Sequence, residues 1–147
     1  DVVSFAKGIG GGLPLAGIMA GAKTETVLTP GTHATTFGGN PICCAGGLSV
    51  LEQLDDALLA DVKKKGAYLK EKISAMPGVK EVRGMGLMLG VALTDQEGYG
   101  AKVNAMIEKG LLCLTAGHST IRLLPPLTIS QEEMDQGLAI MAEVLGA

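Results

Sequence analysis

The chain has 147 residues, 47% of them apolar, and its 12 basic and 15 acidic side chains give a formal net charge of −3. This charge argues against nucleic acid or an anionic membrane as a partner, and the apolar content is enough for a folded core. The three cysteines, two of them adjacent, cannot form a closed set of disulfides, which favours a reducing, cytoplasmic setting.

The first third of the chain is poor in charge. Residues 1–51 carry only four charged side chains, so we expect this part to be buried against protein, a ligand or a second subunit. Residues 26–51 carry none, but their prolines and glycines interrupt any helix long enough to span a bilayer. The expected elements are strands at 2–6 and 15–22, irregular glycine-rich loops at 8–12 and 29–41, and a helix at 41–54.

The remaining residues predict helices alternating with strands, which is typical of an α/β fold. Pro77-Gly78 ends the first of these helices, and Ser130 followed by Glu132 and Glu133 indicates the start of the last. The expected elements are a helix at 56–76, two strands within 79–93, a helix at 98–109, strands at 111–114 and 120–124, and a helix from 130 to about 145.

Lys7 is the first candidate for chemistry, because it is the only basic residue among the first 22 and lies between an apolar strand and a glycine-rich loop. A lone lysine at a strand end usually reaches into water, and that role stays open here. Where a lysine amine is kept from water or lies beside another cation, it becomes a neutral nucleophile that condenses with an aldehyde. The glycines at 8–12 would let a cofactor approach the backbone closely.

Residues 31–41 (GTHATTFGGNP) are the second candidate, because hydroxyls and glycines precede a helix start. Threonine hydroxyls and the N–H groups at a helix N-terminus bind anions such as phosphate. The same run is also an ordinary turn before a helix, and neither glycine loop has the Gly-Lys-Ser/Thr of a nucleotide-binding P-loop. For His33 and His118 we expect ordinary hydrogen bonds, because neither has a partner at metal-ligand spacing.

Arg122 is the third candidate, because apolar residues flank its guanidinium, which needs an anion. A salt bridge to a carboxylate of the protein and a bidentate clamp on a substrate carboxylate are equally good interpretations. The other arginine, Arg83, lies in a charged stretch, so we expect it to be structural or solvated.

Four segments follow one another in an order that is more specific than any one of them. They are Ser4–Leu15 (SFAKGIGGGLPL), Thr32–Pro41 (THATTFGGNP), Arg83–Leu87 (RGMGL) and Arg122–Leu127 (RLLPPL). In this order they resemble the class III pyridoxal-phosphate-dependent aminotransferases, and the resemblance covers the whole chain. Residues 111–117 followed by the Arg122 segment are most similar to members that act on N-acetylornithine.

The resemblance implies the C-terminal part of a fold-type I transferase: the end of the large cofactor-binding domain at 1–50, and an inter-domain helix with the small C-terminal α/β domain at 51–147. Lys7 matches the lysine that holds pyridoxal phosphate and shuttles the proton. Thr36 matches the threonine that binds the cofactor phosphate of the neighbouring subunit, and Arg122 the arginine that grips a substrate carboxylate. The expected substrates are an ω-amino acid and 2-oxoglutarate, and the expected assembly is a homodimer with shared active sites.

In the family, the carboxylate that pairs with the pyridine nitrogen, the ring-stacking aromatic and the phosphate loop precede the lysine. We therefore expect a fragment of a longer enzyme, with little or no activity as an isolated chain. Ornithine, 4-aminobutyrate and succinylornithine stay open as amino donors. A non-catalytic dimerisation domain is the alternative from another class of protein.

Overall fold

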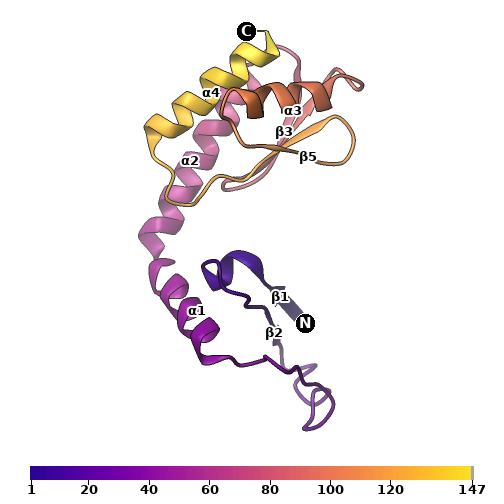
Figure 1. Cartoon of the computed structure of the whole chain (residues 1–147), viewed down its shortest axis with the longest axis vertical. Helices are drawn as coiled ribbons and strands as arrows, with labels where there is room; N and C mark the ends of the chain where they lie inside the picture. Colours follow the sequence, from indigo (N-terminus) through magenta and orange to yellow (C-terminus); the bar gives the residue numbers. More distant parts are fainter. Residues whose placement is uncertain (147) are drawn as a thin grey trace. The chain divides into compact units, whose positions relative to one another are not determined.

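The computed structural model describes residues 1–146, whose elements are drawn in Figure 1. The chain divides into two compact units, the first at Asp1–Asp55 and the second beginning at Asp56. The assignment of residues 1–50 to a larger cofactor-binding domain stays a prediction. No helix within residues 1–146 is long and apolar enough to cross a membrane.

The first unit holds two short strands, a 3-10 helix and an α-helix. β1 and β2 pair antiparallel, with Phe5 opposite Gly17. Asn40 caps α1, because its side-chain oxygen accepts hydrogen bonds from the backbone N–H groups of Ile42 (3.0 Å) and Cys43 (3.2 Å). The elements are β1 (Val2–Phe5), η1 (Lys7–Gly10), β2 (Gly17–Ala20) and α1 (Pro41–Gln53).

These elements confirm the predicted strands and helix, but the expectation of an irregular loop at residues 8–12 is wrong for residues 8–10. The backbone N–H of Gly11 donates to the carbonyl of Gly8 at 3.1 Å, which closes a 3-10 turn. Gly11 then adopts a φ of 60° and ends the turn. The glycines therefore terminate a regular element here instead of preventing one.

The second unit is a four-stranded sheet packed against three helices. Its strands are antiparallel in the order β3-β4-β6-β5. The elements are α2 (Asp56–Ser74), β3 (Val79–Met85), β4 (Met88–Leu93), α3 (Tyr99–Glu108), β5 (Leu114–Thr115), β6 (Thr120–Leu123) and α4 (Gln131–Leu145).

The strand predicted at 111–114 is displaced to Leu114–Thr115. The backbone N–H of Leu111 still bonds to the carbonyl of Met106 at 2.9 Å, and Gly110 takes a φ of 97°. The residues after α3 therefore complete the end of that helix before the strand begins.

The core of the second unit lies between one face of the sheet and all three helices. Ile73 of α2, Met106 of α3 and Met141 of α4 share a single buried cluster with alternate residues of β4 and β6. Because side chains alternate along a strand, the residues between these buried positions point to the opposite face, which the helices leave uncovered. That uncovered face carries Arg83 of β3 and Arg122 of β6. Both pair with Gly90 on the strand between them, β4.

Asp95 holds the turn before α3 together. Its carboxylate accepts hydrogen bonds from the backbone N–H groups of Glu97 (3.1 Å) and Gly98 (3.0 Å) and lies 3.0 Å from Lys102 Nζ. The bond from Gly98 is the largest cause that lowers the pKa of Asp95 from 3.8 to about 2.

Because the folded-state pKa of Asp95 lies below the unfolded value, its charged form stabilises the fold above pH 4, and this stabilisation is lost as the pH falls toward 2. We expect Asp95→Asn to lower the urea midpoint of unfolding at pH 6 and to match the wild type more closely as the pH falls below 4. Glu108→Gln, which removes an exposed carboxylate from α3, is the control. A deficit in Asp95→Asn that stays constant from pH 6 to pH 2.5 would contradict this prediction.

Candidate active site

Lys7 follows β1 after one intervening residue, Ala6, and opens the 3-10 turn. Its φ of 61° falls in the left-handed region, which is uncommon for a residue with a side chain and marks local strain. The side chain is exposed and lines a shallow hollow with Gly8, Gly12, Leu13 and Pro14. A Cβ atom added at Gly8 or Gly12 would meet nothing within 4 Å, so a ligand has open access to the backbone beside the amine.

The Lys7 amine makes no hydrogen bond or ion pair with any of residues 1–146. The other lysine of the first unit, Lys23, instead lies 3.3 Å from the Asp1 carboxylate. Residues 1–146 leave the Lys7 side chain exposed, so its shielding from water stays a prediction for the complete protein. The amine is thus unengaged and accessible, as a group that condenses with an aldehyde must be.

Thr36 lies in the exposed loop before α1. Its hydroxyl has no hydrogen-bond partner in the described part of the chain, whereas the nearby Thr32 hydroxyl donates to the carbonyl of Thr29 at 2.7 Å. The side chain after it, Phe37, is 83% exposed. Asn40 already engages two of the N–H groups at the start of α1, whereas the Thr36 hydroxyl is free to donate to a ligand.

His33 meets the expectation of ordinary hydrogen bonding, because its Nδ1 lies 3.2 Å from the Thr32 hydroxyl. Within residues 1–146, no three histidine, cysteine or acidic side chains are grouped so that they could hold a metal ion. Lys7 and Thr36 are therefore the two predicted site residues of the first unit, and both are unengaged. Lys7 lines one hollow, and Thr36 follows Thr35, which lines another.

Arg122 lies in the middle of β6, exposed on the uncovered face of the sheet. Its neighbours in the pairing register are Gly90 on β4 and Leu114 on β5. No salt bridge joins Arg122 to a carboxylate within residues 1–146, so the structural interpretation of this arginine finds no partner here. The guanidinium is available to an anion from outside the chain.

Arg83 lines the same shallow depression as Arg122, together with Gly90 and Thr120. The bonds of Arg83 to Glu81 and Thr120 agree with its interpretation from sequence as structural or solvated. That interpretation did not predict that Arg83 lies near Arg122. Strand pairing reveals that the two arginines are neighbours, because both pair with Gly90. The pairing of β4 with a strand some thirty residues later cannot be read from local pattern.

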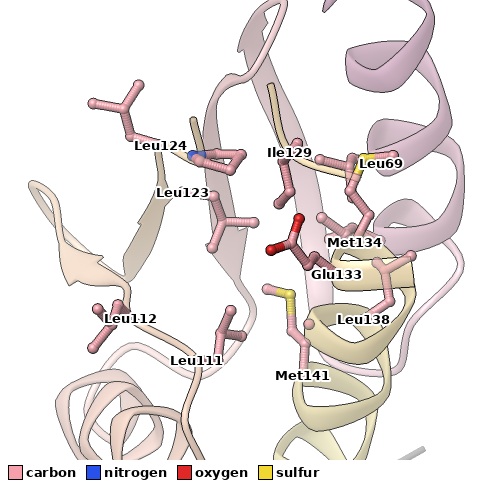
Figure 2. Close-up of a pocket in the computed structure, with 13 residues that line it drawn as sticks. Leu69, Leu111, Leu112, Leu123, Leu124, Ile129, Glu133, Met134, Leu138 and Met141 are labelled. Carbon is pink, nitrogen blue, oxygen red and sulfur yellow. The ribbon is translucent and has the colours of Figure 1, made fainter. Parts of the chain in front are cut away.

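The second unit also contains an apolar pocket, and none of the three predicted site residues lines it. Figure 2 shows leucine and methionine side chains around it, including Leu123, Met134 and Met141. Its one charged lining residue, Glu133, accepts hydrogen bonds from the backbone N–H and hydroxyl of Ser130 at the start of α4. This pocket therefore offers mainly hydrophobic contact, and its one carboxylate is engaged in capping α4.

The chain matches the model of the class-III aminotransferase family over residues 1–145. It is 42% identical to the acetylornithine aminotransferase of Caldanaerobacter subterraneus over 150 residues, which cover 99% of this chain and 38% of that protein. It is 37% identical to the acetylornithine aminotransferase of Haemophilus ducreyi over 145 residues, which cover 99% of this chain and 37% of that protein. The chain thus spans less than two fifths of the length of these relatives.

Solved structures give the same result. An acetylornithine aminotransferase from Elizabethkingia anophelis superposes with a TM-score of 0.86 at 28% identity, over 99% of this chain and 40% of that one. An ornithine aminotransferase from Toxoplasma gondii superposes with a TM-score of 0.87 at 30% identity, over 99% of this chain and 36% of that one. The α/β fold implied by the resemblance is confirmed, and the chain belongs to the class-III aminotransferases.

Proposed function

We propose that the protein carrying this chain is a pyridoxal-phosphate-dependent aminotransferase. It would move the amino group of N-acetylornithine, or of a similar ω-amino acid, to 2-oxoglutarate in arginine biosynthesis. The observation that carries the proposal is Lys7, an unengaged amine on a left-handed turn beside an open glycine-rich hollow. The names of the similar proteins support N-acetylornithine as the donor.

The residues present fit both the reactive aldehyde and the anchoring phosphate of pyridoxal phosphate. Its aldehyde requires an accessible amine, which Lys7 offers, and its phosphate requires hydrogen-bond donors, of which the Thr36 hydroxyl is one. A similar structure, that of the Toxoplasma gondii ornithine aminotransferase, has pyridoxal phosphate at partial occupancy at its active site. When bound, pyridoxal phosphate supplies an electron sink for the carbon that loses or gains the amino group.

Lys7 would act twice in the reaction. Its Nζ would first hold the cofactor covalently and then, once the substrate amine has displaced it, would be a free base beside the substrate carbon. There it would accept a proton from that carbon and deliver it to the cofactor side. The open hollow next to Lys7 leaves space for this exchange.

Arg122 would orient the substrate. A guanidinium binds a carboxylate through two parallel hydrogen bonds, which fixes both the position and the plane of the acid. Its place in the middle of a paired strand makes it rigid enough to do so. Both the amino acid and the 2-oxo acid carry a carboxylate, so the same arginine would serve both half-reactions.

The loop that carries Thr36 would act across a homodimer. The Thr36 hydroxyl would donate to the phosphate of the cofactor bound by the partner subunit. Phe37 is 83% exposed and Ile42 is 69% exposed, as expected of side chains that a second subunit covers. The three free cysteines support a reducing, cytoplasmic setting for this dimer.

A donor assay on the complete protein tests the proposal. With 2-oxoglutarate as acceptor, we expect N-acetylornithine to react faster than ornithine, 4-aminobutyrate or succinylornithine. Faster reaction of ornithine would keep the mechanism and change the substrate; the structural likeness to ornithine aminotransferases makes ornithine the first alternative. No amino transfer from any of the four would refute the proposed function.

Chemical mapping separates the enzyme from a non-catalytic dimerisation domain. Addition of pyridoxal phosphate, reduction with borohydride and peptide mapping should place the label on Lys7. Lys63 and Lys64, which are exposed on α2, are the internal controls for unspecific labelling. Label spread over these lysines and absent from Lys7 would favour the dimerisation domain.

A further inference from the structure

Arg83 and Arg122 occupy one row across the sheet. Arg83 of β3 pairs with Gly90 of β4, and Gly90 pairs with Arg122 of β6. Residues paired in this way point to the same face, and adjacent strands lie about 4.8 Å apart. The two guanidinium groups, which are the only ones in the chain, therefore rise from the same face with one glycine between them.

The Arg83 side chain crosses this glycine. Its Nη2 donates to the hydroxyl oxygen of Thr120 at 3.1 Å, although Thr120 is on β6, two strands away. A Cβ atom at position 90 would come within 3.3 Å of Thr120 Cγ2 and 3.6 Å of Arg83 Cγ. Because Gly90 has no side chain, Arg83 can extend across it to β6. A side chain at position 90 would crowd both Arg83 and Thr120.

The bond to Thr120 continues into the turn that precedes Arg122. The Thr120 hydroxyl donates to the carbonyl of His118 at 2.9 Å. Between them, Ser119 holds a φ of 48°, a strained conformation for a residue with a side chain. Arg83 therefore fixes, through Thr120, the strained turn from which the Arg122 strand begins.

The positive charge of Arg83 contributes in addition to its contact with Thr120. The only carboxylate paired with Arg83 within residues 1–146 is Glu81, at 3.4 Å and with both side chains more than half exposed. Such an exposed pair is weak. The two guanidinium groups outnumber the single carboxylate, which leaves the depression positive and attractive to an anion.

We propose that Arg83 is a positioning residue for the carboxylate site that Arg122 anchors, and that it acts across Gly90 and through Thr120. The proposal rests on the proposed function for the identity of the anion, a substrate carboxylate. It adds a residue that binds no reacting atom but keeps the Arg122 strand in place and raises the local positive potential.

The test uses the complete protein loaded with cofactor, and glutarate as an unreactive dicarboxylate probe. We expect Arg83→Gln to weaken glutarate binding about tenfold in calorimetric titration, because a charge-assisted hydrogen bond is lost. The KM for 2-oxoglutarate should rise by a similar factor, while kcat stays within about twofold because the reacting atoms are untouched. Lys80→Gln, which removes an exposed positive charge from the same strand, should leave both values near those of the wild type.

Two further variants keep the proposal falsifiable if Arg83→Gln folds poorly. Thr120→Val removes the hydrogen-bond acceptor and keeps both arginines, and we expect a weaker loss of glutarate affinity in the same direction. Arg83→Lys should recover part of the affinity, because the charge returns without the second directional donor. Glutarate affinities of Arg83→Gln and Thr120→Val equal to that of the wild type, or no glutarate binding by the wild type, would overturn the proposal.

The proposed function fails by a different result. Absence of amino transfer in the wild type would refute the aminotransferase, whereas the glutarate titration requires no turnover and still decides the role of Arg83.

Discussion

Replacement of Lys7 by alanine in the complete protein is expected to lower the rate of amino transfer at least about 10³-fold. The substitution removes both the covalent attachment of the cofactor and the proton carrier, and proton transfer alone contributes roughly 10² to 10⁴-fold. Because Lys7 is exposed and unengaged within residues 1–146, its removal leaves no buried partner unsatisfied, so stability should change little. The measurement is a single-turnover rate alongside a urea unfolding curve.

Two variants define the cause of that loss. Lys7→Arg keeps the positive charge but offers no amine that condenses with an aldehyde, and it should be as inactive as Lys7→Ala. Lys23→Ala, which removes the other lysine of the first unit, should keep full activity. Partial rescue of Lys7→Ala by added methylamine would support the role of a free base, and more than a tenth of wild-type activity without rescue would refute it.

The helix boundaries of this chain could be predicted well because the signals are local. Pro41 starts α1 as expected, with Asn40 as the N-cap before it, and Ser130 with Glu133 forms a complete capping box at α4. Each signal depends on residues within three positions of one another, so no tertiary information is needed. The displacement of β5 shows the opposite case, because its bounds depend on how α3 ends at Gly110 and on pairing with β6.

The site residues also divide into features that local sequence predicts and features that depend on tertiary structure. Lys7 could be singled out by its isolation among apolar and glycine residues, but its positive φ could not be predicted, because non-glycine residues rarely adopt it. Arg122 could be singled out by its apolar flanks. The neighbouring position of Arg83 could not, because a strand register between distant segments depends on the packed sheet and not on either segment alone.

Gly66→Ala is expected to destabilise the second unit strongly. Gly66 is buried in α2, and a Cβ atom there would overlap the backbone carbonyl of Gly86 in the turn between β3 and β4. Met85 and Met88 pair with each other on either side of this two-residue turn, so the turn has little freedom to move away. Since the added Cβ atom would overlap backbone atoms, no side chain can rotate to relieve the overlap. We expect a loss of about 3 kcal/mol in the free energy of unfolding.

A glycine-to-alanine substitution in another helix should change the free energy of unfolding in the opposite direction. A Cβ atom at Gly100 in α3 meets nothing within 4 Å, so Gly100→Ala should stabilise the fold by about 0.5 to 1 kcal/mol through helix propensity. Urea unfolding of both variants separates close packing from propensity, since propensity alone would stabilise both. A Gly66→Ala protein as stable as the wild type would mean that α2 does not approach the β3–β4 turn as closely as the structure indicates, and the packing of α2 on the sheet would have to be revised.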